Sequence, residues 1–250
     1  MSILDRIFGP VPDLPKPSYA DDEKRARLVL WISCVLLILL IFRGGFPWPR
    51  DFNPDWASWD PRGLESRIYW ASWGFLFYLA IPALLLAGIF RESPARYGFR
   101  IYLSRRTVAL YALMLAVMLP ALFWASTQEA FLRKYPFVAN LGPGWQEIVV
   151  WEVIYVTRFI ALEFFFRGFL LFGIEGRFGI HNAVVISTIP YSLIHYAKPF
   201  PEAIGSIFAG AALGYTALRT RSIFGGVLLH GTVALGMDLL ALWRKGVIFQ

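Results

Sequence analysis

Long apolar runs constrain this chain more than any other feature of its sequence. Seven of them follow one another between residues 28 and 243, separated by short segments rich in Arg, Lys, Pro or Asp. About 20 apolar residues in a helix are enough to cross the hydrocarbon core of a bilayer. Because the backbone must satisfy its own hydrogen bonds there, a helix is favoured. The pattern predicts an all-α integral membrane protein, a bundle of about seven to eight transmembrane helices.

The runs also divide the chain into parts. They cover about residues 28–42, 69–90, 107–126, 151–174, 183–197, 202–218 and 222–243. We expect a single membrane domain made of three parts. A polar, amphiphilic tail spans 1–26, N-terminal transmembrane helices and loops span 27–145, and a C-terminal set of helices spans 146–250.

Composition fixes the environment of the chain. Hydrophobic residues make up 57% of it and charged residues 16%, whereas soluble proteins carry roughly 25% charged residues. The net charge of +7 is explained by basic loops that face the cytoplasm and its anionic lipids. We therefore expect a multi-pass protein of the cell inner or plasma membrane. Its expected partner is the lipid bilayer, and no nucleic acid is expected to bind.

The run 151–174 contains two ionisable residues, Glu163 and Arg167. They are four residues apart and so share one helical face. Each costs roughly 2.5–3.5 kcal/mol to insert at the bilayer centre, so both are predicted to face the protein interior. One interpretation is a buried ion pair that holds helices together, which by itself is weak evidence for function. The other is a functional polar site.

Two histidines favour the second interpretation. His195 and His230 lie in two later apolar runs, and we expect both to converge on Glu163 within the bundle. A carboxylate that acts as base and imidazoles that donate hydrogen bonds can together activate a water molecule. Each histidine taken alone is equally compatible with a hydrogen-bonded core residue.

The same three side chains could bind zinc. The sequence has no HExxH motif, however, so no metal or other cofactor is predicted and zinc is left as an unsupported alternative. Asp238 and Glu152 share helix faces with His230 and Glu163 but lie about 12 and 16 Å away along the axis. Both are therefore predicted to lie outside the site.

Small residues concentrate in the last two runs. Ser206, Gly210 and Gly214 recur every four residues, a pattern that lets two helix backbones approach closely. Gly225 and Gly226 thin the helix near His230 in the same way. Tight helix packing explains both stripes, and room for an extended peptide beside His230 is compatible with it.

Three motifs resemble those of the CAAX-protease and bacteriocin-processing (CPBP, or Abi) family. EFFFRG at 163–168, YSLIH at 191–195 and the helix with His230 are similar, in order and spacing, to the EExxxR, FxxxH and HxxxN/D motifs of that family. The resemblance covers about residues 150–243. It implies a bundle with an active site inside, in which Glu163, His195 and His230 are catalytic and Arg167 and Tyr191 support them.

The family consists of intramembrane glutamate-type endopeptidases, long described as metalloproteases, and some of them trim prenylated CAAX proteins. The resemblance implies hydrolysis of a peptide bond in a membrane-associated protein or peptide, with His195 orienting the water and His230 donating to the oxyanion. This chain departs from the motifs at three positions. Leu162 replaces the first Glu, Tyr191 replaces the Phe, and Ala234 replaces the Asn or Asp.

These departures leave a second class of function open. A catalytically degenerate member would bind a membrane peptide, or act as an immunity or scaffold protein, without cleaving. Two histidines would be surplus in a packing pair, so the sequence favours the protease.

Overall fold

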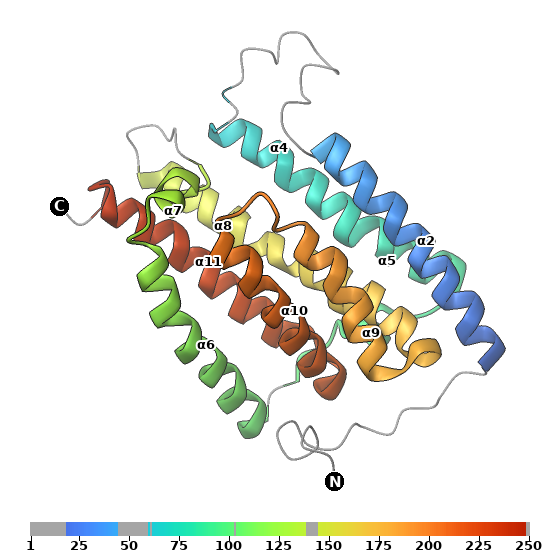
Figure 1. Ribbon diagram of the computed structural model, residues 1–250. Helices are drawn as coiled ribbons and strands as arrows, with labels where there is room; N and C mark the ends of the chain where they lie inside the picture. The colour runs from blue at the N-terminus through green and yellow to red at the C-terminus, as the bar shows by residue number, and fades with distance from the viewer. Residues whose placement is uncertain (1–18, 45–59, 61, 103, 139–144, 249–250) are drawn as a thin grey trace.

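The computed structural model describes residues 19–44, 60, 62–102, 104–138 and 145–248 (Figure 1). Helices run alongside one another in one bundle, and no strand occurs among these residues. The prediction of an all-α bundle is thus confirmed. Most of the tail predicted over 1–26 lies outside the described residues, and the division of the chain into three parts stays a prediction.

The N-terminal half supplies three long helices and two short ones. Helix α2 spans Tyr19–Gly44, so it begins inside the segment predicted as tail. A continuous helical rod spans α4 (Leu64–Phe75), the π-helix η2 (Leu76–Ala80), α5 (Ile81–Leu85) and the π-helix η3 (Leu86–Phe90). The 3₁₀ turn η4 (Pro94–Tyr97), α6 (Arg105–Ala125) and α7 (Glu129–Lys134) follow.

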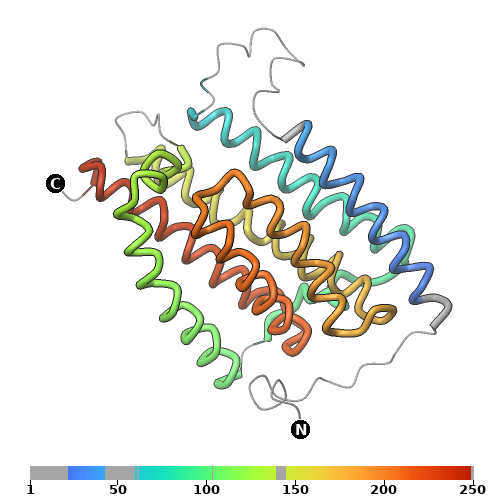
Figure 2. The backbone as a smooth tube through the Cα atoms, viewed as in Figure 1, coloured from blue at the N-terminus to red at the C-terminus, as the bar shows by residue number. Residues whose placement is uncertain are grey.

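The C-terminal half contains four long helical rods. Helix α8 (Trp145–Glu163) continues as the π-helix η5 (Phe164–Phe172), and α9 (Gly173–Leu193) follows directly. Helices α10 (Phe200–Thr220) and α11 (Phe224–Arg244) complete the chain. The tube in Figure 2 shows α9 and α10 lying in front of α8 and α11, and α9 contacts α10 as α8 contacts α11.

Two boundaries differ from the sequence prediction. The connection expected at 176–182 is part of α9, which bends at Gly179, where φ is +73° and only glycine is unstrained. His195, expected within a span, lies in the turn after α9, where its N–H donates to the Ser192 carbonyl at 3.0 Å. The nearby Pro199 and Pro201 prevent the helix from continuing, because proline lacks the N–H that a helix needs.

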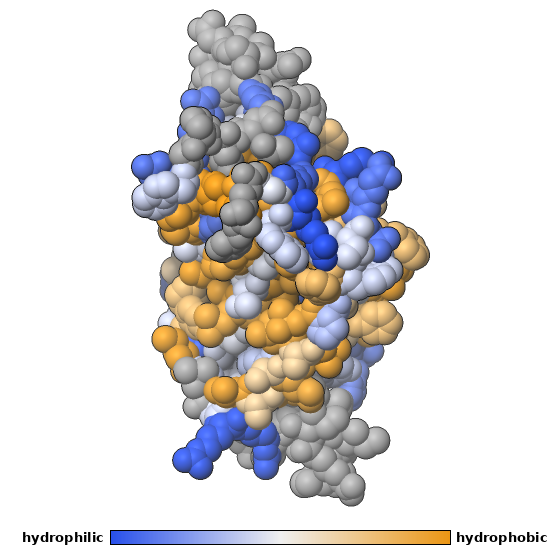
Figure 3. Space-filling view, turned by 90° about the vertical axis from the view of Figure 1, so that its left-hand side faces the viewer, coloured by the Kyte–Doolittle hydropathy of each residue, from blue (hydrophilic) through white to orange (hydrophobic). Residues whose placement is uncertain are grey.

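Within the described part of the chain, four helices are long and apolar enough to cross a membrane, and the chain is an integral membrane protein. They span Asp22–Phe42, Leu64–Phe90, Arg105–Ala125 and Phe224–Arg244. Apolar residues gather across the middle of the face in Figure 3, with hydrophilic residues toward its two ends. The other three predicted crossings, on α8 with η5, α9 and α10, stay predictions. Charged residues such as Glu152, Arg158 and Glu163 lower the hydropathy of α8.

The buried side chains form two apolar clusters. The larger one joins α2, the α4–η3 rod, η5, α9 and α10, and includes Phe166 and Tyr191. The smaller one joins α6, α7, the first part of α8 and α11, and includes Tyr155 and Phe159. Because α8 contributes to both clusters, its C-terminal end lies where they meet.

The close packing predicted for Ser206, Gly210 and Gly214 is confirmed. A Cβ atom at Gly210 would come within 2.8 Å of Thr188 on α9, and one at Gly214 within 3.3 Å of Val184. Any larger side chain would push α9 and α10 apart, so these small residues set the distance between the two helices.

Candidate functional site

Glu163 is the last residue of α8 and its side chain is fully buried. One carboxylate oxygen, Oε1, lies 3.0 Å from His230 Nδ1 and 3.4 Å from Arg167 Nη1. The other oxygen, Oε2, has no hydrogen-bond partner among the described residues. A buried carboxylate held on one side by an imidazole and a guanidinium is therefore the centre of the site.

The π-helix η5 begins directly after Glu163 and carries Arg167. π-helical segments are rare and occur frequently at functional sites. All nine residues of η5 are buried, and Gly168 lets the carbonyl of Tyr97 approach the helix, since a Cβ there would lie 2.8 Å from that oxygen. The rigid surroundings of η5 fix Arg167 beside the carboxylate.

Arg167 contacts both Glu163 and Tyr191. Its Cζ lies 3.9 Å from the centre of the Tyr191 ring, and only 2% of the residue is exposed. A guanidinium over an aromatic face gains a cation–π interaction that is strongest where water is excluded. The aromatic residue at 191 thus positions the arginine, and the arginine balances the charge of Glu163.

The two histidine rings lie nearly parallel, with centroids 6.5 Å apart and an interplanar angle of 22°. His195 Nδ1 lies 2.8 Å from the backbone carbonyl of Tyr191. Because a carbonyl oxygen only accepts, Nδ1 carries the hydrogen and Nε2 is left as an acceptor in the neutral ring. His230 packs on Phe159 at 4.2 Å between centroids. The structure therefore brings Glu163, His195, His230, Arg167 and Tyr191 together.

Two glycines of α11 make room for this arrangement. A Cβ at Gly226 would lie 2.8 Å from Glu163 Oε2, and one at Gly225 would lie 2.0 Å from the ring of Tyr111 on α6. The space that the sequence offered to an extended peptide beside these glycines is filled by Glu163 and Tyr111. Tyr111 was missed in the sequence because no motif marks it.

At two motif positions this chain has buried apolar residues in place of the polar residues of the family. Leu162 belongs to the larger apolar cluster and Ala234 to the smaller one.

Two other buried acids lie outside this arrangement. Asp238 accepts hydrogen bonds from the Phe137 backbone N–H and the Trp151 indole, both at 2.9 Å. The Glu152 carboxylate is buried with no hydrogen-bond partner among the described residues. Among the described residues, neither acid forms a hydrogen bond or ion pair with Glu163 or the two histidines.

The prediction that the site binds no metal ion stays a prediction. No group of three or more His, Cys, Asp and Glu side chains close enough to hold one occurs in the described part of the chain. Oε1 of Glu163 and Nδ1 of His230 already face each other, which leaves only one oxygen of this carboxylate for a metal.

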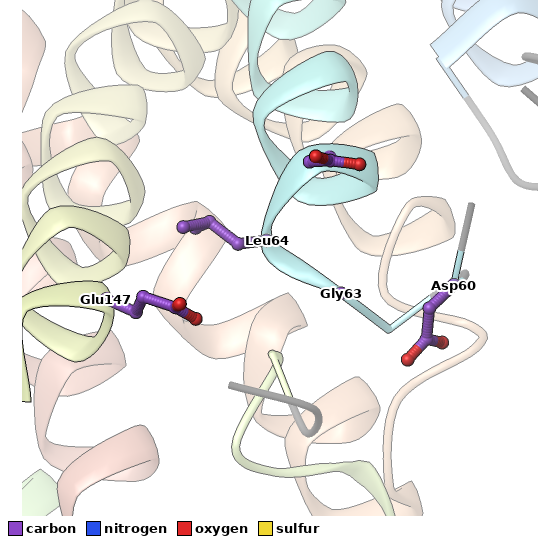
Figure 4. Close-up of a pocket in the computed structure, with 5 residues that line it drawn as sticks. Asp60, Gly63, Leu64 and Glu147 are labelled. Carbon is purple, nitrogen blue, oxygen red and sulfur yellow. The ribbon is translucent and has the colours of Figure 1, made fainter. Parts of the chain in front are cut away.

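Two surface pockets lie away from Glu163. One, of about 280 Å³, is formed where α4 and α8 begin, and its lining includes Asp60, Gly63, Leu64 and Glu147 (Figure 4). The other, of about 240 Å³, lies between α7 and the α9–α10 turn. The lining of the second pocket includes Lys198, which lies three residues after His195.

The structure places the buried Glu163 carboxylate near the two imidazoles, and these are the side chains that the three motifs single out. Residues 143–236 match the family model described as type II CAAX prenyl endopeptidase Rce1-like. This segment carries all three motifs, so the resemblance predicted from them is confirmed over residues 143–236. No curated protein and no solved structure matched the chain.

Proposed function

We propose that the chain is an intramembrane endopeptidase in which Glu163 and His230 activate water. The observation that carries this proposal is the 3.0 Å contact between Glu163 Oε1 and His230 Nδ1 inside a fully buried site. The protease family of residues 143–236 supports it. A role in packing alone would not need the second histidine, His195, beside the pair.

The contact supports His230 as the group that takes the proton. A carboxylate only accepts, so His230 Nδ1–H donates to Glu163, and Nε2 of the neutral ring is left as the base. In Ser-His-Asp triads a carboxylate fixes the histidine tautomer in the same way. In this proposal His230 acts as the base. It does not donate to the oxyanion, as the family motif implies, because its Nδ1 hydrogen is already directed at Glu163.

The proposed reaction is hydrolysis of one peptide bond. Water attacks the carbonyl carbon while His230 Nε2 takes one of its protons, and His195 Nε2 accepts a hydrogen bond from the other. As the C–N bond breaks, His230 returns the proton to the leaving amine. Glu163, beside Arg167, remains ionised and stabilises the imidazolium that forms in between.

The substrate we propose is a membrane-associated protein or peptide with a lipid-modified C-terminus. The family description, which names prenyl CAAX endopeptidases, supports this class. Exposed apolar residues of the bundle, among them Phe208 and Leu228, support a substrate that is bound to the membrane. We propose that the protein acts in the cell inner or plasma membrane without a metal cofactor.

The test uses full-length protein in liposomes with prenylated and unprenylated CAAX peptides, and mass spectrometry detects cleavage. Glu163→Gln keeps the size of the side chain but no longer fixes the His230 tautomer, and the equivalent loss in a triad costs about 10⁴-fold in rate. We expect His230→Ala to be as inactive and His195→Ala to retain a little activity. Exposed Glu129→Gln on α7 is the matched control.

Chelators are expected to leave the rate unchanged, and inhibition that added zinc reverses would contradict the proposed chemistry. If wild type and Glu163→Gln cleave equally, Glu163 takes no part in the chemistry and the proposed mechanism is wrong. Binding of the same peptides with no cleavage by wild type would favour a peptide-binding or scaffold function instead.

A further inference from the structure

A basic pocket lies at the end of the bundle where α7 meets the turn between α9 and α10. It has a volume of about 240 Å³ and is lined by Ala130, Arg133, Lys134, Ala197, Lys198 and Pro199. This is about eight times the share of one water molecule in the liquid. The pocket has room for a phosphate and the polar group that it carries.

The three cations of the pocket differ in their partners. Arg133 pairs with Glu129 at 2.5 Å, and Lys198 with Glu202 at 3.1 Å. Lys134 has no carboxylate partner among the described residues, and its Nζ lies 5.5 Å from the centre of the Phe137 ring. Lys198 Nζ lies over the same ring at 4.5 Å. One ammonium at the pocket is therefore left for an external anion.

Burial and the neighbouring cations Lys198 and Arg67 lower the pKa of Lys134. Burial is the largest cause of this lowered pKa, and the neighbouring cations add to it while Glu202 opposes it. The pocket also lies beside the first turn of α10, where the N-cap residue Pro199 makes no side-chain hydrogen bond to the helix. The partial positive charge of a helix N-terminus adds to that of the lysines.

Exposed apolar side chains surround this charge. Tyr196 and Phe200, on either side of the lining residues 197–199, are 84% and 76% exposed. Aromatic residues exposed in this way are typical of the membrane–water interface. From Phe200 an exposed stripe continues along α10 through Ile204 and Phe208 toward the apolar middle of the bundle.

A cationic pocket at the membrane interface that leads into an apolar stripe matches a molecule with an anionic headgroup and apolar chains. We propose that this pocket binds the phosphate headgroup of an anionic phospholipid, whose acyl chains lie along the exposed face of α10. The headgroup is bound by Lys134 and by the α10 N-terminus. A bound lipid would bridge α7 and the turn that carries His195.

The site is tested by native mass spectrometry of full-length protein in detergent, with phosphatidylglycerol and phosphatidylcholine added in turn. We expect wild type to retain phosphatidylglycerol in preference to phosphatidylcholine. Lys134→Gln should bind phosphatidylglycerol about fivefold more weakly, since one basic residue near an anionic lipid contributes about 1 kcal/mol. Lys134→Arg should keep the preference. Arg105→Gln, which removes an exposed cation at the first residue of α6, should also keep it.

Equal retention of the two lipids by wild type, or an unchanged preference in Lys134→Gln, would overturn the proposal. Inorganic phosphate and a peptide with a free C-terminal carboxylate are added as competitors. Displacement of the lipid by phosphate at equal concentration would assign the pocket to free anions. Displacement by the peptide would assign it to a peptide terminus. The readout needs no proteolysis, so its result is independent of the proposed enzymatic activity.

Discussion

His230 and Arg167 both contact the same oxygen of the Glu163 carboxylate, Oε1. The other oxygen, Oε2, faces Gly226. An ion pair that only held helices together would be expected to use both oxygens, because a buried polar atom without a partner costs about 1–3 kcal/mol. A buried pair can be replaced by apolar side chains with little loss of stability. The one-sided arrangement therefore favours a functional role for Glu163 over packing.

The first prediction at this scale concerns Arg167. Arg167→Leu removes the guanidinium and leaves the Glu163 charge unpaired in the interior, which costs about 3–5 kcal/mol. Thermal unfolding in detergent should show a clear loss of stability. The double variant Glu163→Leu with Arg167→Leu should recover much of it, because both charges are then gone.

The control for Arg167→Leu is Arg105→Leu, which removes an exposed arginine at the start of α6. Equal stability of the two single variants would mean that Arg167 does not neutralise Glu163. A double variant less stable than Arg167→Leu would contradict the ion pair as well.

At the scale of elements, the site depends on close contacts between helices. The π-helix η5 presents Arg167, the turn after α9 presents His195, and α11 presents His230. Glycines let these elements approach, with Tyr111 of α6 placed directly over Gly225. The side chains that form the site are thus positioned by packing around α11.

Gly225→Ala tests this packing. Its Cβ would lie 2.0 Å from a ring carbon of Tyr111, so α6 and α11 must separate or the ring must turn. We expect a lower unfolding temperature by differential scanning fluorimetry. Gly205→Ala on α10, where nothing lies within 4 Å of the new Cβ, should leave stability unchanged or raise it, because Ala is the better helix former.

The opposite order, with Gly205→Ala the less stable of the two, would show that Tyr111 does not pack on Gly225. Loss of stability in Gly225→Ala that Tyr111→Leu relieves would support the contact further, since the smaller side chain makes room for the methyl group.

The elements show what the sequence could predict. The helices were found because apolar runs have the length of a span, and Glu163, His195 and His230 because polar groups are rare in such runs. The π-helix η5 was not predicted, because its shifted hydrogen bonds leave no mark on hydropathy. The contact of Tyr111 with Gly225 joins segments 114 residues apart, and a single sequence has no signal for such a contact.

For the whole molecule, the two apolar clusters meet at the site. Phe159 of the smaller cluster packs on His230, while Tyr191 of the larger cluster packs on His195 at 4.8 Å.

A second set of contacts joins elements within each half of the chain. Arg25 of α2 donates to Glu92 at 2.9 Å, Tyr97 donates to the same carboxylate, and Arg221 pairs with Glu175. The geometry of the site thus depends on the assembly of both halves of the chain.

The last prediction concerns Asp238, which joins three parts of the smaller cluster. Its two oxygens accept from the Phe137 N–H, in the segment after α7, and from the Trp151 indole on α8. In Asp238→Asn one of these donors faces an NH₂ group, and a buried unsatisfied donor costs about 1–3 kcal/mol. We therefore expect a lower unfolding temperature and a changed tryptophan emission from Trp151. Exposed Glu129→Gln, which breaks a surface ion pair, should change stability by about 0–1 kcal/mol. A variant as stable as this control, with unchanged emission, would show that Asp238 does not hold α11 to α8, and the smaller cluster would then be stabilised by its apolar contacts alone.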